Sequence, residues 1–276
     1  MKKEGLIITA LLFSIISLLP AQEALHRSLS LSWGTGNLKR QDLTFSPMIH
    51  QKWSPVNFIF EYTRAKKLEQ NVSVQFGQYR PIIGEQYDFF SFYNGESSTY
   101  PHVLSMIDIN YSLGKKVAEN KSWDLTVGGR SRNRLLGTDY NFGEFNSFGY
   151  YFSFGLDLWL QVQMEAGEKH HIKAHMALPV FSYNCRSYYL WHTDEHLWEN
   201  YSHNGLKAFA NYLSGGEIQS WGQSQGADLD VQYFYELSEK WQIGGRYLFS
   251  MSFNQDPTRF AQVENVLYLT AKMNLN

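Results

Sequence analysis

The residues from Phe148 to Met164 alternate between apolar and other side chains, and this regularity constrains the fold more than any other feature of the sequence. The even positions of this stretch are all apolar: Phe148, Tyr150, Phe152, Phe154, Leu156, Leu158, Leu160, Val162 and Met164. A period of two belongs to a β-strand, because successive strand side chains point to opposite faces. At roughly 3.3 Å per residue the stretch would extend about 56 Å, whereas strands of soluble proteins usually have about 5 or 6 residues. A tilted transmembrane strand needs about 9 to 11 residues in the hydrocarbon, so this length indicates a strand that crosses a membrane and continues beyond it.

The overall composition is compatible with membrane strands, although it is not strongly apolar. Hydrophobic residues make up 43% and aromatic residues 16% of the chain, yet the mean hydropathy is −0.37. Alternating strands produce this combination, because half of their side chains face lipid and half face the interior. The net charge of −2 argues against nucleic acid as a partner. The single cysteine, Cys185, excludes an intrachain disulfide.

The first residues have the pattern of a secretory signal peptide. Lys2 and Lys3 precede an apolar run from Leu6 to Leu19, and small residues follow. We predict a signal peptide over residues 1–24, with cleavage near Ala21 or Ala24, and a single barrel domain over residues 25–276. The apolar run is shorter than the roughly 20 residues that a membrane-spanning helix needs.

Alternation in the remaining sequence predicts about ten strands, within a range of about eight to twelve. The expected connections alternate between short polar turns (64–70, 114–121, 165–168, 237–240) and longer loops (35–41, 81–101, 133–146, 184–225, 252–258). Pro47 and Pro55 interrupt the second strand, where we expect a bulge, a bend or an edge outside the membrane. Aromatic residues flank the short turns on the apolar parity, as at a membrane interface: Tyr62, Tyr111, Trp123, Tyr235 and Trp241.

With its signal peptide, alternating strands, unequal connections and aromatic girdle, the chain resembles the outer-membrane β-barrel proteins of Gram-negative bacteria over nearly its whole mature length. The resemblance implies an all-β fold, a single transmembrane antiparallel up-and-down barrel with long extracellular loops, located in the bacterial outer membrane. Such chains usually end on an aromatic residue, whereas this one ends on Leu275-Asn276. A soluble barrel of the lipocalin type is the alternative fold, but its outward faces would be polar.

If the apolar parity faces lipid, charged side chains of both signs face the barrel interior. The residues that we expect to line the lumen are Asp108, Arg130, Arg132, Asp157, Lys173, His175, Asp228, Asp230 and Arg246. A barrel of about ten strands is narrow enough for such side chains to meet across it. They would form either a salt-bridged plug or the wall of a narrow aqueous path, and the plug requires nearly every acid to find a partner.

The predicted loop 184–225 contains the densest group of reactive side chains: His192, Asp194, His196 and His203. Asp194-Glu195-His196 resembles the Asp-x-His element of the omptin proteases, but Glu85 and Asp88 do not match their paired aspartates. Ser202-His203-Asn204 resembles, in scrambled order, an element of the outer-membrane lipid A deacylases. The sequence predicts no catalytic residue, no cofactor and no metal site.

The function that the sequence favours is non-enzymatic. We expect an integral barrel with an interior filled by charged side chains, whose aromatic-rich outer loops recognise other molecules or bind an extracellular or periplasmic protein. A narrow porin-like channel for small solutes is one alternative. A hydrolase at the outer rim is another. The expected surroundings are outer-membrane lipid.

Overall fold

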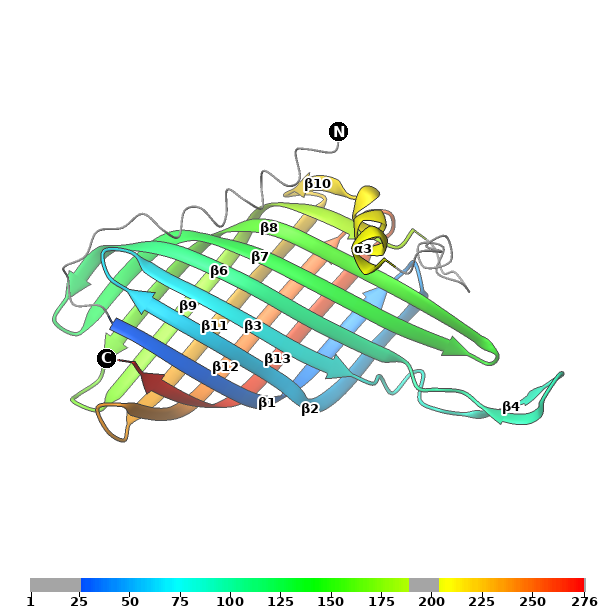
Figure 1. Ribbon diagram of the computed structural model, residues 1–276, viewed down its shortest axis with the longest axis horizontal. Coiled ribbons are helices and arrows are strands. Elements are labelled where there is room, and N and C mark those ends of the chain that lie inside the picture. The colour runs from blue at the N-terminus through cyan, green and yellow to red at the C-terminus, as the bar shows by residue number, and fades with distance from the viewer. Residues whose placement is uncertain (1–25, 189–203, 276) are drawn as a thin grey trace.

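The computed structural model describes residues 26–188 and 204–275 of the chain. Ten long antiparallel strands in these ranges form a closed barrel (Figure 1). They are β1 (His26–Asp42), β2 (Ser46–Ala65), β3 (Glu69–Tyr79), β6 (Val103–Asn120), β7 (Trp123–Phe142), β8 (Phe145–Glu165), β9 (His170–Arg186), β11 (Ser224–Glu236), β12 (Trp241–Asn254) and β13 (Phe260–Asn274). Each strand pairs with the next in this order, and β13 pairs with β1 to close the barrel. The predicted all-β fold with about ten barrel strands is therefore confirmed.

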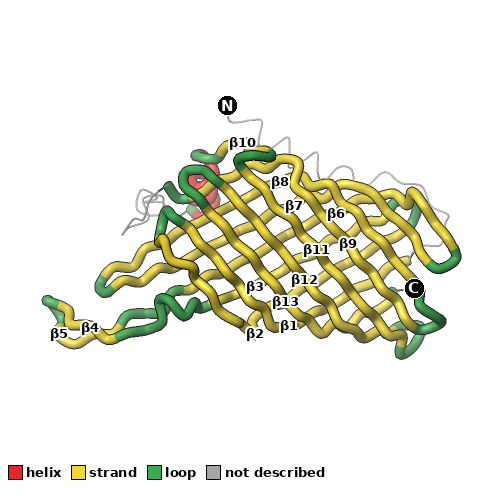
Figure 2. The backbone as a smooth tube through the Cα atoms, turned by 180° about the vertical axis from the view of Figure 1, so that it is seen from behind, coloured by secondary structure: helices red, strands yellow, loops and turns green. Residues whose placement is uncertain are grey.

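The two ends of the barrel differ. At one end, which we call the turn end, short connections join β2 to β3, β6 to β7, β8 to β9 and β11 to β12, and the described chain ends lie there. The other end, the loop end, carries the hairpin of β4 (Asp88–Ser91) and β5 (Gly95–Ser98), helix α3 (Gly205–Ser214) and the short strand β10 (Glu217–Ser220). Figure 2 shows the strands running obliquely between the two ends, with the hairpin projecting past the loop end. Since outer-membrane barrels have short periplasmic turns, the turn end corresponds to the periplasmic side.

The outer wall is apolar over the middle of the barrel. On β8 the large even-numbered side chains that follow Phe154 are exposed or half-buried, whereas Asp157, Trp159 and Gln161 on the odd positions are buried inside. Other strands of the barrel repeat this arrangement, with Phe58, Ile109, Leu229 and Leu269 outside. The predicted girdle residues Trp123, Tyr235 and Trp241 lie outside at the turn end. The apolar belt is the surface that lipid would cover.

The barrel strands extend farther toward the loop end than the sequence pattern predicted. The expected loops 35–41 and 133–146 are mostly strand, because β1 continues to Asp42 and β7 to Phe142. Both predictions were wrong for the same reason. These segments pair as strands above the apolar belt, where outward positions such as Lys39 and Asp139 are polar and the apolar alternation fades.

The described parts of the segment 184–225, residues 184–188 and 204–225, contain more regular structure than predicted. The ends of the segment belong to β9 and β11, and it contains α3 and β10. Strand β10 pairs with residues 181–184 of β9 and so extends the sheet at the loop end. The bulges expected at the prolines are confirmed: the register of β1 with β2 shifts between Gly34 and Gly36, opposite Pro55, and again between Arg40 and Asp42, opposite Pro47.

Candidate functional site

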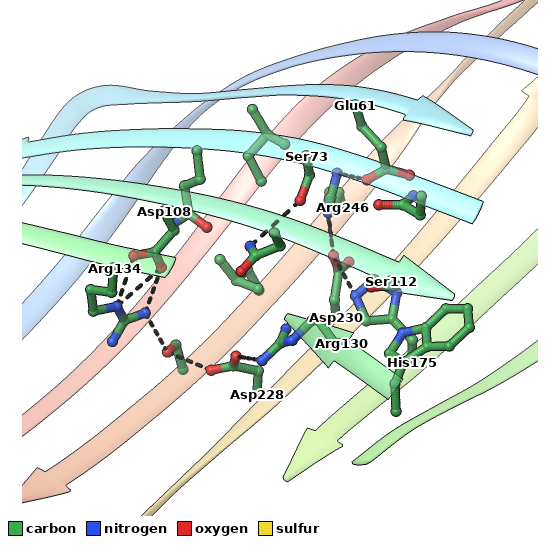
Figure 3. A pocket seen from close by; sticks show the side chains of 17 residues that line it. Glu61, Ser73, Asp108, Ser112, Arg130, Arg134, His175, Asp228, Asp230 and Arg246 are labelled. Carbon is green, nitrogen blue, oxygen red and sulfur yellow. Dashed lines mark hydrogen bonds and ion pairs between the residues drawn. The ribbon is translucent and has the colours of Figure 1, made fainter. Parts of the chain in front are cut away.

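A chain of ion pairs crosses the middle of the barrel interior. Arg130 on β7 donates from Nε to Asp157 on β8 at 2.9 Å and from Nη2 at 2.6 Å. The same guanidinium reaches across the lumen to Asp228 on β11, which also accepts from Arg132 at 3.5 Å. Figure 3 shows Arg130 and Asp228 facing each other in this layer. Two arginines and two aspartates from three strands thus neutralise one another.

A second group lies next to this layer. Arg134 on β7 donates from Nε and Nη2 to the Asp108 carboxylate on β6, at 2.8 and 2.6 Å. Its Nη1 and Nη2 also contact the hydroxyls of Ser252 and Ser250, both at 3.2 Å. Ser250 in turn donates to Asp228 at 2.6 Å, so the two groups form one continuous network (Figure 3).

A third group lies closer to the turn end. Arg246 on β12 pairs with Glu61 on β2 at 3.0 Å and with Asp230 on β11. His175 on β9 lies 3.3 Å from the same Asp230 carboxylate. These side chains are shielded from solvent by the barrel wall, because the side chains of Arg246, Glu61 and Asp230 are 5%, 6% and 1% exposed.

Little free space remains between these groups. The cavity at the centre of the network has a volume of about 30 Å³, which leaves room for only a few water molecules. Larger cavities, of about 180 and 340 Å³, open at the turn end. Both of them are lined by His26, Gln163, Lys173, Phe234 and Lys272. Lys173 pairs there with Glu69 at 3.1 Å, and the Lys272 ammonium lies 5.1 Å from the centre of the Phe234 ring.

Apolar side chains are buried in the interior both at the level of the ion pairs and between the ion pairs and the loop end. Three buried clusters are present: Leu38, Phe45, Tyr79, Leu104 and Tyr140; Ile59, Leu248, Val266 and Tyr268; and Met106, Leu136, Tyr151 and Phe260. The sequence reasoning missed them, because it assigned every interior position of the barrel to polar side chains. Charged groups and packed rings together occupy the lumen.

The interior near the loop end also holds a small polar group. Asp42 accepts from Arg40 at 3.1 Å and from Arg186, and both guanidinium groups lie over the Phe260 ring, at 5.1 and 5.3 Å from its centre. His50 on β2 lies beside this group, above the apolar belt. Burial, followed by the neighbouring charge of His102, lowers the pKa of His50 to about 4.

The structure places all nine predicted lumen residues inside the barrel and brings each within reach of an oppositely charged group, and three of the partners lie outside the predicted set. Arg246 pairs with Glu61. Asp108 pairs with Arg134, which the sequence reasoning had placed in a loop, and Lys173 pairs with Glu69. The even-numbered spacing of Arg130, Arg132 and Arg134 was the signal that could have identified the missed arginine.

The loop candidates His192, Asp194, His196 and His203 lie outside the described residues. Of the two acids compared above with the omptin aspartates, Glu85 pairs with Lys52 at 2.8 Å, while Asp88 accepts from Ser98 in the β4–β5 hairpin. Within residues 26–188 and 204–275, no cluster of three or more His, Cys, Asp or Glu side chains is arranged to hold a metal ion. No helix in the same ranges is long and apolar enough to span a bilayer.

The β4–β5 hairpin projects beyond the loop end of the barrel (Figures 1 and 2). Large aromatic side chains are exposed along it: Phe90 is 78%, Phe92 91% and Tyr93 85% exposed. Ser91 at its tip donates to Glu144 in the turn between β7 and β8, and Tyr87 at its base accepts from the Gly143 N–H at 2.8 Å. The hairpin is therefore attached to a neighbouring turn while its rings remain outside.

A closed barrel with an apolar outer belt and a charged interior defines the class of outer-membrane β-barrel proteins. No family model matches the sequence, and no curated protein matches it. Among solved structures, the chain is similar to the outer membrane protease OmpT from Escherichia coli, with a TM-score of 0.55 and 8% identity over 94% of this chain and 99% of that one. At this identity the likeness concerns the fold.

Two further structures match with lower scores. They are the neisserial surface protein A (TM-score 0.37, 7% identity, 91% of this chain and 99% of that one) and the β domain of the Bordetella autotransporter BrkA (TM-score 0.36, 9% identity, 92% and 100%). The fold class predicted from the sequence agrees with the structure and with the fold of OmpT, and the predicted outer-membrane location agrees with the closed barrel and its apolar outer belt.

Proposed function

We propose that this outer-membrane barrel is closed to solutes and acts at the cell surface, where the β4–β5 hairpin binds another molecule. The observation that carries the proposal is the hairpin itself: Phe90, Phe92 and Tyr93 project past the barrel with at least three quarters of each side chain exposed. Aromatic side chains supply much of the binding energy of interfaces, because they offer a large contact area. Adjacent exposed apolar side chains of this size are typical of surfaces that bind another molecule.

The filled interior supports the same proposal, because it favours a closed barrel over a solute channel. A solute channel needs a continuous aqueous path, whereas the ion-pair network leaves about 30 Å³ and the apolar clusters occupy the lumen between it and the loop end. The interior charges are also mutually paired, so they offer few free groups to a passing ion.

Conductance measurements in planar bilayers test the closed barrel. The purified full-length protein should give no steady single-channel steps, while a general porin measured in the same bilayers serves as the positive control. Regular steps of constant size would support the channel instead.

Site-specific photo-crosslinking in cells tests the recognition role. A benzophenone amino acid placed at Phe92 should give a discrete adduct of defined mass, and the double substitution Tyr93→Ser with Phe90→Ser should remove it. The matched control is the same probe at Ile109, which faces lipid and is 42% exposed. If Phe92 gives no adduct beyond those seen at Ile109, the hairpin does not bind a partner under the conditions used.

The third function predicted from the sequence, a hydrolase at the outer rim, stays a prediction. Its candidate histidines lie outside the described residues, and no geometry at the loop end in residues 26–188 and 204–275 supports it over the recognition role.

A further inference from the structure

Helix α3 packs against the outside of the barrel wall. The ring of Phe209 lies 5.9 Å from that of Phe152, and the ring of Tyr212 lies 4.7 Å from that of Tyr150 and 6.4 Å from that of Phe148. These three β8 residues continue the outward-facing apolar row that covers the membrane belt. Figure 1 shows α3 beside the wall near the loop end.

Specific hydrogen bonds hold the helix in this place. The side chain of Asn204 caps its first turn by accepting from the backbone N–H groups of Leu206 and Lys207, at 3.0 and 3.2 Å. At the other end, the hydroxyl of Tyr183 donates to the carbonyl of Leu213 at 2.7 Å, and that of Tyr188 donates to the carbonyl of Gly215 at 3.0 Å. The helix is therefore attached to β9 as well as to β8.

The helix is amphipathic along its length. Leu206, Phe209 and Leu213 follow one another at spacings of three and four residues, as expected for one face of a helix, and Lys207, Asn211 and Ser214 form a polar stripe. Only part of the apolar stripe is used in packing on β8. Leu206 is 81% exposed and Phe209 40% exposed.

Strand β10 and the turn after it add further exposed apolar side chains at the loop end. Ile218 on β10 is 74% exposed and Trp221 is 57% exposed. The indole N–H of Trp221 donates to the carbonyl of Pro179 on β9 at 2.6 Å, which fixes the ring against the barrel wall. Tryptophan with one polar contact and an apolar ring is typical of membrane interfaces.

The level of α3 on the barrel corresponds to the outer boundary of the membrane. Trp123 pairs with Met164 at the turn end, where the girdle lies. A transmembrane strand spends about 9 to 11 residues in the hydrocarbon, so the span that begins near Met164 ends near Phe154. The helix contacts the next outward residues of that row, starting at Phe152.

We propose that α3 and β10 form a lipid-binding platform whose apolar side chains, Leu206, Phe209, Ile218 and Trp221, insert into the outer leaflet of the membrane. Outer-leaflet lipid is the occupant that the structure favours, because the exposed stripe is continuous with the wall that lipid already covers. Amphipathic helices bind membrane interfaces in this way, with the apolar face in the acyl chains and the polar face toward water. This inference rests on the barrel's position in the membrane and does not depend on the hairpin's recognition role.

Nitroxide accessibility measured by electron paramagnetic resonance tests the platform. Full-length protein is reconstituted in phospholipid vesicles after Cys185→Ala, which removes the single native cysteine. A spin label is then attached at Leu206→Cys or, in a separate sample, at Lys207→Cys. These adjacent positions lie at nearly the same depth but on different stripes, so each is the matched control for the other.

The label at position 206 should be more accessible to oxygen, which concentrates in lipid, than to a water-soluble nickel chelate, and this ratio should reverse at position 207. A label at Ile218→Cys gives an independent reading and should behave like position 206. Reference labels at Leu158→Cys and Lys121→Cys define the lipid-facing and aqueous extremes, and variants are compared only if their circular dichroism shows the β-sheet of the parent.

Two results would overturn the proposal. Equal preference for the nickel chelate at positions 206, 207 and 218 would show a helix exposed to water. Shielding of positions 206 and 218 from both reagents would show that protein covers the platform, and cross-linking between copies would then distinguish a second copy of this chain from another partner.

Discussion

Replacing Arg134 by methionine should destabilise the barrel strongly, because it keeps an unbranched apolar stem but removes the guanidinium group. Arg134 supplies the contacts of Asp108 at 2.6 to 3.1 Å, and the side chains of the two residues are 3% and 4% exposed. In Arg134→Met the carboxylate stays buried without its cation. Removing one partner of a buried ion pair costs about 3–5 kcal/mol, mostly through the charge left behind.

A second substitution separates this explanation from simple loss of packing. When Asp108→Leu is combined with Arg134→Met, the uncompensated charge is gone, and apolar replacements of a buried pair are neutral or stabilising by about 1–4 kcal/mol. The double variant should therefore recover most or all of the stability that the single variant loses. Adding the single variant Asp108→Leu completes a double-mutant cycle, which gives the coupling energy between the two side chains.

Urea unfolding of the protein in detergent micelles, followed by tryptophan fluorescence, measures both effects. With a dependence of about 1–3 kcal/mol per molar urea, a loss of 3 kcal/mol lowers the midpoint by about 1–3 M. The reasoning is refuted if the single variant unfolds at the wild-type midpoint. It is also refuted if the double variant is as unstable as the single one, because the buried charge would then not be the cause.

Three further predictions concern packing, a buried hydroxyl and pH. A Cβ on Gly114 would lie 2.4 Å from the indole of a buried tryptophan. Gly114→Val should therefore lower the free energy of unfolding, measured in urea, by about 1–3 kcal/mol. Gly129→Ala is the control and should unfold like the wild type, because its Cβ would have only one contact, at 3.8 Å. Tyr79 donates to Glu264 at 2.8 Å in a buried site, so Tyr79→Phe should lower the free energy of unfolding by about 1–3 kcal/mol, and an unchanged midpoint would contradict this role. The pKa of His50 is lowered to about 4, so the unfolded state binds the proton first and stability should fall as pH drops from about 6.5 toward 4. His50→Gln should flatten that part of the profile, and parallel pH profiles for variant and wild type would argue against this assignment.

The architecture was predictable from the sequence because lipid imposes a strict rule. Every second residue between Phe154 and Met164 must be apolar where it faces hydrocarbon, and the same rule identified the other barrel strands. Above the membrane the rule no longer applies. Outward positions become polar, as at Lys39 and Asp139, and the strands there were read as loops.

The interior was only partly predictable. Parity alone assigned Arg130, Asp157 and Asp228 to the lumen, because charged side chains are costly on a lipid face. The alternation could not predict which side chains pair, because pairing depends on the stagger between strands. Arg130, for example, pairs with Asp228, which lies 98 positions later in the sequence. The apolar clusters near the loop end were missed because the sequence reasoning assigned the apolar face of each strand to lipid. Under that assumption, apolar side chains near the loop end are predicted to point outward.

The pairing of Arg130 with Asp228 also has a mechanical consequence. Hydrogen bonds between neighbouring strands fix the circumference of a barrel, but they leave its cross-section free to flatten under lateral pressure from the bilayer. The ion pair between β7 and β11 joins two strands that are not adjacent, so it links separate parts of the wall through the interior. The ion pair between Arg246 on β12 and Glu61 on β2 adds a second such link. Flattening the barrel would change the distance between the charged groups of these pairs. The ion pairs therefore oppose a change in the shape of the barrel's cross-section.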